Sequence, residues 1–187
     1  VCRLNSHYDV LDLTQIPDDY LPRTNYVPDC SPDEYCRRTP CVPWDDQKPV
    51  TEFYRLVCRR QLSQSGDRTL LPSIVPKESG HIHPVISFTY ADLKKLIDFC
   101  GLCSSVVYDF YIKTTGKSDL YESTLKLLPF PEVQPTLRSR TLALNCLTTY
   151  YSELWQDCWE DNFKQDNWTK PRDPRLNPNF FQQLSPQ

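Results

Sequence analysis

Proline spacing limits this chain more than any other feature. Seventeen of its 187 residues are proline, and each proline fixes φ and removes a backbone donor, so prolines interrupt helices and inner strands. Pro17, Pro22 and Pro28 exclude a long regular element within residues 1–30. The partly alternating apolar residues of 7–16 permit one strand there. The tail from residue 162 onward is rich in Asn, Pro, Asp and Gln, and we predict that it is irregular.

Two helices are predicted between residues 31 and 63. Ser31-Pro32-Asp33-Glu34 combines an N-cap serine, a first-turn proline and a capping-box glutamate. This helix must be short, because Pro40 ends it. The segment Thr51–Ser63 predicts a second helix, since its apolar residues can form one stripe: Phe53, Leu56, Val57 and Leu62.

Two strands and three further helices follow. Arg68–Val75 and Pro84–Tyr90 are short runs rich in β-forming residues, so we predict that they pair with each other. Apolar residues recur at helical spacing through 90–113 and through 136–161, which predicts two long helices. A short helix over 118–127 would end before Pro129.

These elements predict an α+β fold, in which a small β-sheet packs with several helices and the chain ends in a long C-terminal helix and an irregular Pro/Asn-rich tail. The length suits one domain, or one domain with a helical appendage. We place an α+β domain at residues 1–131 and a helical extension with the tail at 132–187.

Composition excludes several classes of function. The four glycines lie far apart, whereas loops that cradle phosphates need clustered glycines, so no nucleotide-binding loop is present. The net charge of −3 gives no general case for nucleic acid or a membrane surface, although residues 51–130 carry ten Lys and Arg against eight Asp and Glu. No stretch approaches the roughly 20 apolar residues that a membrane span needs. Because the chain starts at Val1 and contains no methionine, we expect it to be part of a longer protein.

Cysteine usage indicates a reducing, cytoplasmic environment. Nine cysteines is an odd number, and several occupy positions where a helix needs an apolar residue, so we predict free thiols. Cys100 and Cys103 imitate a redox CxxC pair, but they fall within a predicted helix and not at its N-terminus, where the dipole would lower the pKa of the first thiol. Cys30, Cys36 and Cys41 could provide three zinc ligands, although their spacing differs from the paired pattern of structural zinc sites.

Other reactive motifs give little evidence of catalysis. His81 and His83 share one side of a strand, where they could bind a metal, contact a ligand or simply end the strand. Asn177-Pro178-Asn179-Phe180 resembles the tetrapeptide with which amino-methyltransferases hold the target amino group, but its third position differs. No nuclease metal motif and no nucleophile elbow are present. We therefore expect no catalytic residue, metal or cofactor in this chain.

The order of motifs from residue 68 onward resembles a known family. Arg68-Thr-Leu-Leu-Pro-Ser-Ile-Val-Pro76 precedes three further segments: His81–Phe88, Cys103–Lys113 and Leu127–Pro131. The second of them includes Tyr-Asp-Phe-Tyr-Ile-Lys, and the last reads Leu-Leu-Pro-Phe-Pro. This series is similar to the target-recognition (TaqI-like C-terminal specificity) region of adenine-N6 DNA methyltransferases, which occurs in type II restriction-modification enzymes and phage-defence methylases. The similarity covers roughly residues 20–155, and Cys103-Ser104-Ser105 stands where the family has Leu-Asn-Ser.

The resemblance implies a non-catalytic domain that recognises double-stranded DNA and positions it for base flipping by a methyltransferase domain upstream in the same polypeptide. S-adenosylmethionine would belong to that upstream domain, and no membrane is involved. Arginine and lysine side chains contact phosphates, and Arg and His can read base edges. We expect these residues to face DNA: Arg55, Arg59, Arg60, Arg68, Lys77, His81, His83, Lys113 and Lys117. The alternative is a structural or protein-interaction module, in which the apolar face of 136–161 and its tryptophans dock a neighbouring domain without touching DNA.

Overall fold

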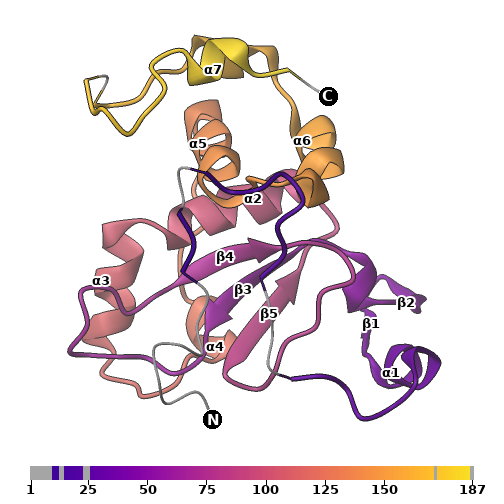
Figure 1. Cartoon of the computed structure of the whole chain (residues 1–187). Coiled ribbons are helices and arrows are strands. Elements are labelled where there is room, and N and C mark those ends of the chain that lie inside the picture. Colours follow the sequence, from indigo (N-terminus) through magenta and orange to yellow (C-terminus); the bar gives the residue numbers. More distant parts are fainter. Residues whose placement is uncertain (1–9, 13–14, 23–25, 171, 186–187) are drawn as a thin grey trace.

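The computed structural model describes residues 10–12, 15–22, 26–170 and 172–185 (Figure 1). Helices and two small antiparallel sheets form an α+β fold, which confirms the predicted class. The expected strand over 7–16 falls largely outside the described residues, and those of its residues that are described form no strand.

Helix α1 (Pro32–Arg38) begins where the sequence predicts. The Ser31 hydroxyl accepts a hydrogen bond from the Glu34 amide at 3.3 Å, and the helix ends at Thr39, before Pro40. A two-stranded ribbon follows, formed by β1 (Cys41–Val42) and β2 (Asp45–Pro49). Helix α1 buries none of its residues, so it lies on the outside of the molecule.

The main sheet has the strand order β4-β3-β5 and is antiparallel throughout. Its strands are β3 (Arg55–Arg59), β4 (Pro72–Val75) and β5 (Val85–Thr89). The two predicted strands are confirmed in shorter form, but β3 lies between them, so their predicted pairing with each other is wrong. The helix predicted over Thr51–Ser63 is also wrong, because this segment forms a 3-10 turn, η2 (Val50–Glu52), and then β3. Residues 54–58 are all buried, as in a strand covered on both faces, so no period-2 alternation was visible.

The single helix predicted over 90–113 is two helices, α2 (Leu93–Cys103) and α3 (Val106–Thr114). Two serines separate them. The Ser104 hydroxyl donates to the Cys100 carbonyl at 2.9 Å, while the Ser105 hydroxyl accepts from the Tyr108 amide at 3.2 Å and begins the second helix. Serine side chains compete with the helical backbone in this way, and they favour helix ends.

The single long helix predicted over 136–161 is also wrong, because this segment forms two helices. Helix α5 (Pro135–Asn145) stops at Cys146, whose carbonyl accepts from the Trp155 indole at 3.0 Å, and η3 (Thr149–Tyr151) leads into α6 (Ser152–Cys158). The short helix predicted over 118–127 is confirmed as α4 (Glu122–Leu125). The tail contains η4 (Asp161–Gln165) and α7 (Phe180–Gln183) between irregular segments. Among the described helices, none is both long and apolar enough to cross a membrane.

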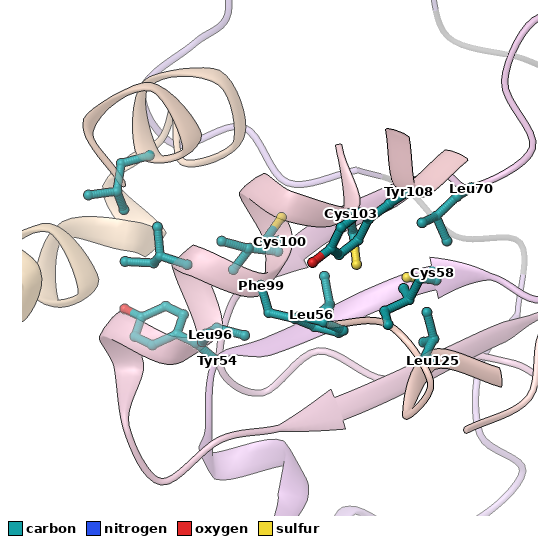
Figure 2. Packing of buried hydrophobic residues seen from close by; sticks show 14 of the residues in the cluster. Tyr54, Leu56, Cys58, Leu70, Leu96, Phe99, Cys100, Cys103, Tyr108 and Leu125 are labelled. Atoms are coloured by element: carbon teal, nitrogen blue, oxygen red, sulfur yellow. The ribbon is translucent and has the colours of Figure 1, made fainter. Parts of the chain in front are cut away.

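Helix α2 lies across the main sheet, and α5 packs on the far side of α2 (Figure 1). Gly101 permits this close approach, because a Cβ at its position would lie 2.5 Å from Thr141 Oγ1 on α5. One buried cluster extends from Leu56 in the sheet through Leu96 on α2 to Leu142 and Leu154. The two expected parts, 1–131 and 132–187, thus share this cluster. Figure 2 shows that Cys58 on β3 and Cys100 and Cys103 on α2 lie within this buried cluster.

Candidate nucleic-acid interface

Three chain segments meet where β3 ends. The Arg60 amide donates to the Pro84 carbonyl at 2.8 Å, and the Arg60 carbonyl accepts from the Leu120 amide at 2.7 Å. The Leu62 amide donates to the Ser118 carbonyl at 2.8 Å. These backbone bonds hold residues 59–62 between the end of the β4–β5 connection and the segment that leads into α4.

Arg60 is the central side chain of this region. Its Nη1 lies 2.8 Å from His83 Nε2, and its guanidinium carbon lies 5.2 Å from the centre of the Tyr121 ring. An arginine can only donate, so the His83 nitrogen accepts and the imidazole carries its proton on Nδ1. Tyr121 is 48% exposed, which leaves much of its side chain accessible. Arg60 is therefore a half-buried cation that lies against the Tyr121 ring and is hydrogen-bonded to the His83 imidazole.

Lys117 lies next to the segment that is bonded to Arg60 and Leu62, and Lys113 precedes it near the end of α3. Lys117 Nζ donates to Thr124 Oγ1 at 2.8 Å, and the Lys117 carbonyl accepts from Gln64 Nε2 at 3.0 Å. Lys113 Nζ donates to the Gly66 carbonyl at 3.0 Å. Their hydrogen-bond partners are neutral, so both ammonium charges remain uncompensated.

We call Arg59, Arg60, His83, Lys113 and Lys117 the basic cluster. Among the described residues, no carboxylate lies within 4.0 Å of its four Lys and Arg charges. Most of the other described arginines do have a carboxylate within 4.0 Å. Unpaired cations are suited to bind the phosphates of a nucleic acid, and Arg60, His83 and Tyr121 could contact base edges or faces.

The other four predicted residues lie elsewhere or are already bound. Arg55 is 2% exposed and donates from Nη2 to the Ser79 carbonyl, so its guanidinium is not on the surface of this structure. Lys77 pairs with Glu153 and lies over the Tyr54 ring, at the opposite end of the sheet.

Arg68 and His81 are also held by the protein itself. Arg68 donates to the Ser104 carbonyl at 2.9 Å, and its Nε lies 3.5 Å from Asp109 Oδ2. Asp109 is buried and also accepts from the Thr69 and Leu70 amides. Arg68 therefore joins the 63–70 segment to the α2–α3 junction. His81 Nε2 lies 2.8 Å from Ser87 Oγ on β5, and the imidazole is exposed.

The arginines of the first third do not share one surface. Arg37 and Arg38 are exposed on α1, where both pair with Glu34. Arg55 is buried, and only Arg59 and Arg60 belong to the basic cluster. Sequence proximity grouped these residues, but α1 carries two of them on the outside of the molecule. Arg55 is buried beside Ser79 at the first residue of β3, at the other end of the strand from Arg59. Tyr121 was missed by the sequence analysis, because its role depends on Arg60 lying over its ring.

The thiol motifs are structural. Burial raises the pKa of Cys58 and of Cys100 to about 12, and it raises the pKa of Cys103 further. A thiol with a raised pKa is a poor nucleophile, so these cysteines act as small apolar core residues. Cys36 and Cys41 are exposed, and the described residues contain no group of three or more His, Cys, Asp or Glu arranged to hold a metal ion.

The Asn177–Phe180 motif is occupied by local contacts. The Asn177 carbonyl accepts from the Trp168 indole at 3.1 Å, and its side-chain amide contacts Gln183 at 3.0 Å. Its Oδ1 accepts from the Asn179 amide at 3.0 Å. These bonds fold the tail around Trp168, which packs against Phe180 and Phe181.

Neither protein-family models, nor curated proteins, nor solved structures match this chain.

Proposed function

We propose that this chain is a non-catalytic domain that recognises double-stranded DNA and positions it for base flipping and adenine methylation by an upstream methyltransferase domain of the same polypeptide. The observation that carries the proposal is the basic cluster, in which His83 and Tyr121 fix Arg60, while Lys117 lies on a segment bonded to Arg60 and Leu62 through the backbone. The motif series from residue 68 to residue 131 supports the same class.

Contacts with the DNA phosphates would supply much of the binding affinity. Each Lys or Arg that neutralises a phosphate releases condensed counterions, and this term dominates affinity for DNA at moderate salt. The net charge of −3 is compatible with such binding if the attached domain contributes further attraction. S-adenosylmethionine would bind in that attached domain, and we assign no residue of this chain to it.

Base recognition would use the fixed side chains at the end of β3. Arg60 and His83 supply hydrogen-bonding groups, and Tyr121 presents a partly exposed ring beside them. A rigid arrangement reduces the entropy lost on binding and fixes the direction of each donor. We also propose a reducing cytoplasmic environment, which is supported by the free thiols of the described cysteines.

The experiment compares two double charge reversals with the same change in net charge. Arg59→Glu with Lys117→Glu alters the basic cluster, whereas Arg37→Glu with Arg38→Glu alters exposed arginines on α1 that already pair with Glu34. Fluorescence anisotropy with a mixed-sequence duplex measures affinity across a salt series. We expect the cluster variant to bind the duplex about tenfold more weakly, or weaker still. The slope of log K against log salt concentration should also become less steep by about two. Equal affinities for the two variants would contradict the proposal.

The alternative function is a protein-interaction module that docks a neighbouring domain. Exposed apolar side chains favour it. Val106, Val107 and Phe110 on α3 are 73%, 73% and 66% exposed, and Leu144 at the end of α5 is 65% exposed. The tryptophans expected to dock are instead engaged within the chain, as Trp155 shows. Phe110→Ser and Leu144→Ser would weaken association with the methyltransferase domain in light scattering if docking is the function, while duplex binding would be absent in the unmodified chain.

A further inference from the structure

Arg55 is a buried cation without a carboxylate partner. It is the first residue of β3 and pairs in register with Val75 and Thr89. Its side chain alternates with that of Leu56, which faces the buried cluster under α2, so Arg55 lies on the opposite face of the sheet. It is 2% exposed. Nη2 donates to the Ser79 carbonyl, and Nε is buried with no hydrogen-bond partner.

Such a guanidinium is costly to bury. It has five N–H donors and a permanent charge, and one neutral carbonyl compensates only a small part of the lost hydration. Burial lowers the pKa of Arg55, and a favourable interaction with Tyr35 partly opposes this effect. Buried charges in proteins are normally paired with an opposite charge. No described carboxylate lies within 4.0 Å of Arg55.

The segment that contacts Arg55 is the connection between β4 and β5. Ser79 belongs to the β4–β5 connection, where the Glu78 backbone has a φ of 62° and its amide donates to the Thr51 carbonyl at 2.7 Å. Next to Ser79, Gly80 packs against the Tyr35 hydroxyl of α1, so closely that a Cβ would lie 2.5 Å from that oxygen. Helix α1 buries no residue of its own. The cover is therefore a short loop closed by one tyrosine of a surface helix.

We propose that Arg55 anchors a binding site for a phosphate-type oxyanion, closed in this structure by the Ser79–Gly80 loop and Tyr35. When the loop moves away, the Nε and Nη2 edge of Arg55 faces the ligand. A phosphate accepts from both nitrogens in a side-on bidentate geometry, replacing the single bond to the Ser79 carbonyl. An inorganic phosphate ion and a nucleic-acid backbone both present this group, and the proposal does not depend on the function proposed above.

Ligand binding and loop opening are coupled in this arrangement. A ligand that binds only the open form shifts the population toward it, and its apparent affinity falls by the fraction of molecules that are open. If about 1–10% of molecules are open, the apparent Kd is about 10- to 100-fold above the intrinsic value. Loosening the cover should therefore strengthen phosphate binding without changing Arg55.

The first experiment measures the melting temperature in sodium phosphate and in sodium chloride of equal ionic strength. We expect phosphate to raise the melting temperature of the unmodified chain, and Arg55→Met to lose this increase. Lys95→Met removes the same charge from an exposed position on α2 and should keep it. If Arg55→Met fails to fold, Arg55→Lys retains the charge but not the bidentate edge, and it should keep less than half of the increase. An equal phosphate response in Lys95→Met and the Arg55 variant would overturn the proposal.

The second experiment tests the cover. Gly80→Ala places a methyl group against the Tyr35 hydroxyl, which lies at the end of a flexible side chain and can move away. Titration calorimetry with inorganic phosphate should give an apparent Kd about 3- to 10-fold lower than in the unmodified chain. An unchanged or higher Kd would show that the loop does not close a site.

A duplex-binding measurement distinguishes the two sources of phosphate. If Arg55→Met weakens duplex binding and inorganic phosphate competes with the duplex, the site takes a backbone phosphate. If phosphate binding is lost but duplex affinity is unchanged, the site takes a free phosphate. Loss of duplex binding in the Arg59/Lys117 variant, with the phosphate response retained, would leave both proposals supported and independent of each other.

Discussion

Arg138 joins three parts of the fold, and its replacement by methionine gives the sharpest stability test. On α5 it donates from Nε and Nη2 to both carboxylate oxygens of Asp98 on α2, at 2.7 and 2.9 Å. Its Nη1 donates to Glu160, after α6, at 2.7 Å, and Lys94 Nζ also contacts Glu160 at 3.1 Å. The hydrogen bonds that Arg138 donates to Asp98 are the main reason that its pKa is raised.

The expected cost follows from burial. Removing one partner of a buried ion pair costs about 3–5 kcal/mol, because the other charge is left without compensation. The Asp98 side chain is 7% exposed, but that of Arg138 is 19% exposed, so solvent screening reduces the expected cost to about 2–4 kcal/mol. Asp98→Leu should cost less, since Arg138 retains Glu160. Replacing both residues should cost about 1–2 kcal/mol less than the sum of the two single changes.

Urea unfolding followed by far-UV circular dichroism at neutral pH measures these free energies. Lys126→Met is the control, because Lys126 pairs with Glu122 across side chains that are 71% and 61% exposed, and it should change stability by less than about 0.5 kcal/mol. A cost for Arg138→Met no larger than that of the control would refute the reasoning. So would strictly additive free energies in the double variant.

Three further predictions concern packing, pH and thiol chemistry. Gly101→Ala should lower stability by about 1–3 kcal/mol in the same assay, since its methyl group would meet Thr141 on α5; a neutral effect would mean that the two helices separate freely. Burial raises the pKa of Asp166, but hydrogen bonds from Arg140, the Asn167 amide and Ser139 outweigh it and leave the pKa below its usual value. The stabilising effect of ionised Asp166 is therefore complete above the ordinary aspartate pKa of 3.8, and it is lost as the pH falls through the lowered value. Asp166→Asn should make the acid unfolding curve less steep below pH 3.8. Ellman's reagent should modify exposed Cys36 in the native protein and reach Cys100 only on unfolding; equal rates for the two thiols would contradict the buried assignment.

Some elements follow from local sequence because their causes are local. The start of α1 depends on the Ser31 hydroxyl and the Pro32 ring within one turn, and both are visible in the sequence. The break between α2 and α3 was missed, although it too is local, because the apolar spacing through 90–113 outweighed the Ser104-Ser105 signal. The apolar character of Cys100 and Cys103 was correctly predicted from their place in that spacing.

The candidate site was predicted only in part. Charge and residue type suggested Arg59, Arg60, His83 and Lys117, and they lie on segments that backbone hydrogen bonds hold together. The same criteria suggested Arg55, which shares a face of β3 with Arg59 but is buried at the first residue of the strand, where it donates to the Ser79 carbonyl. Alternation along the strand places both arginines on one face, so only the contact of Arg55 with the β4–β5 connection separates the buried residue from the exposed one.

By itself the sequence determined the α+β class, the first helix, two of the three main strands and the apolar role of the core thiols, since periodicity and capping chemistry act over a few residues. Only the tertiary structure decided that residues 55–59 are the central strand, because β4 and β5 supply the hydrogen bonds that this segment cannot make alone. The same strand fixes which basic residues reach the surface and which one, Arg55, is buried, and that division depends on contacts between residues far apart in the chain.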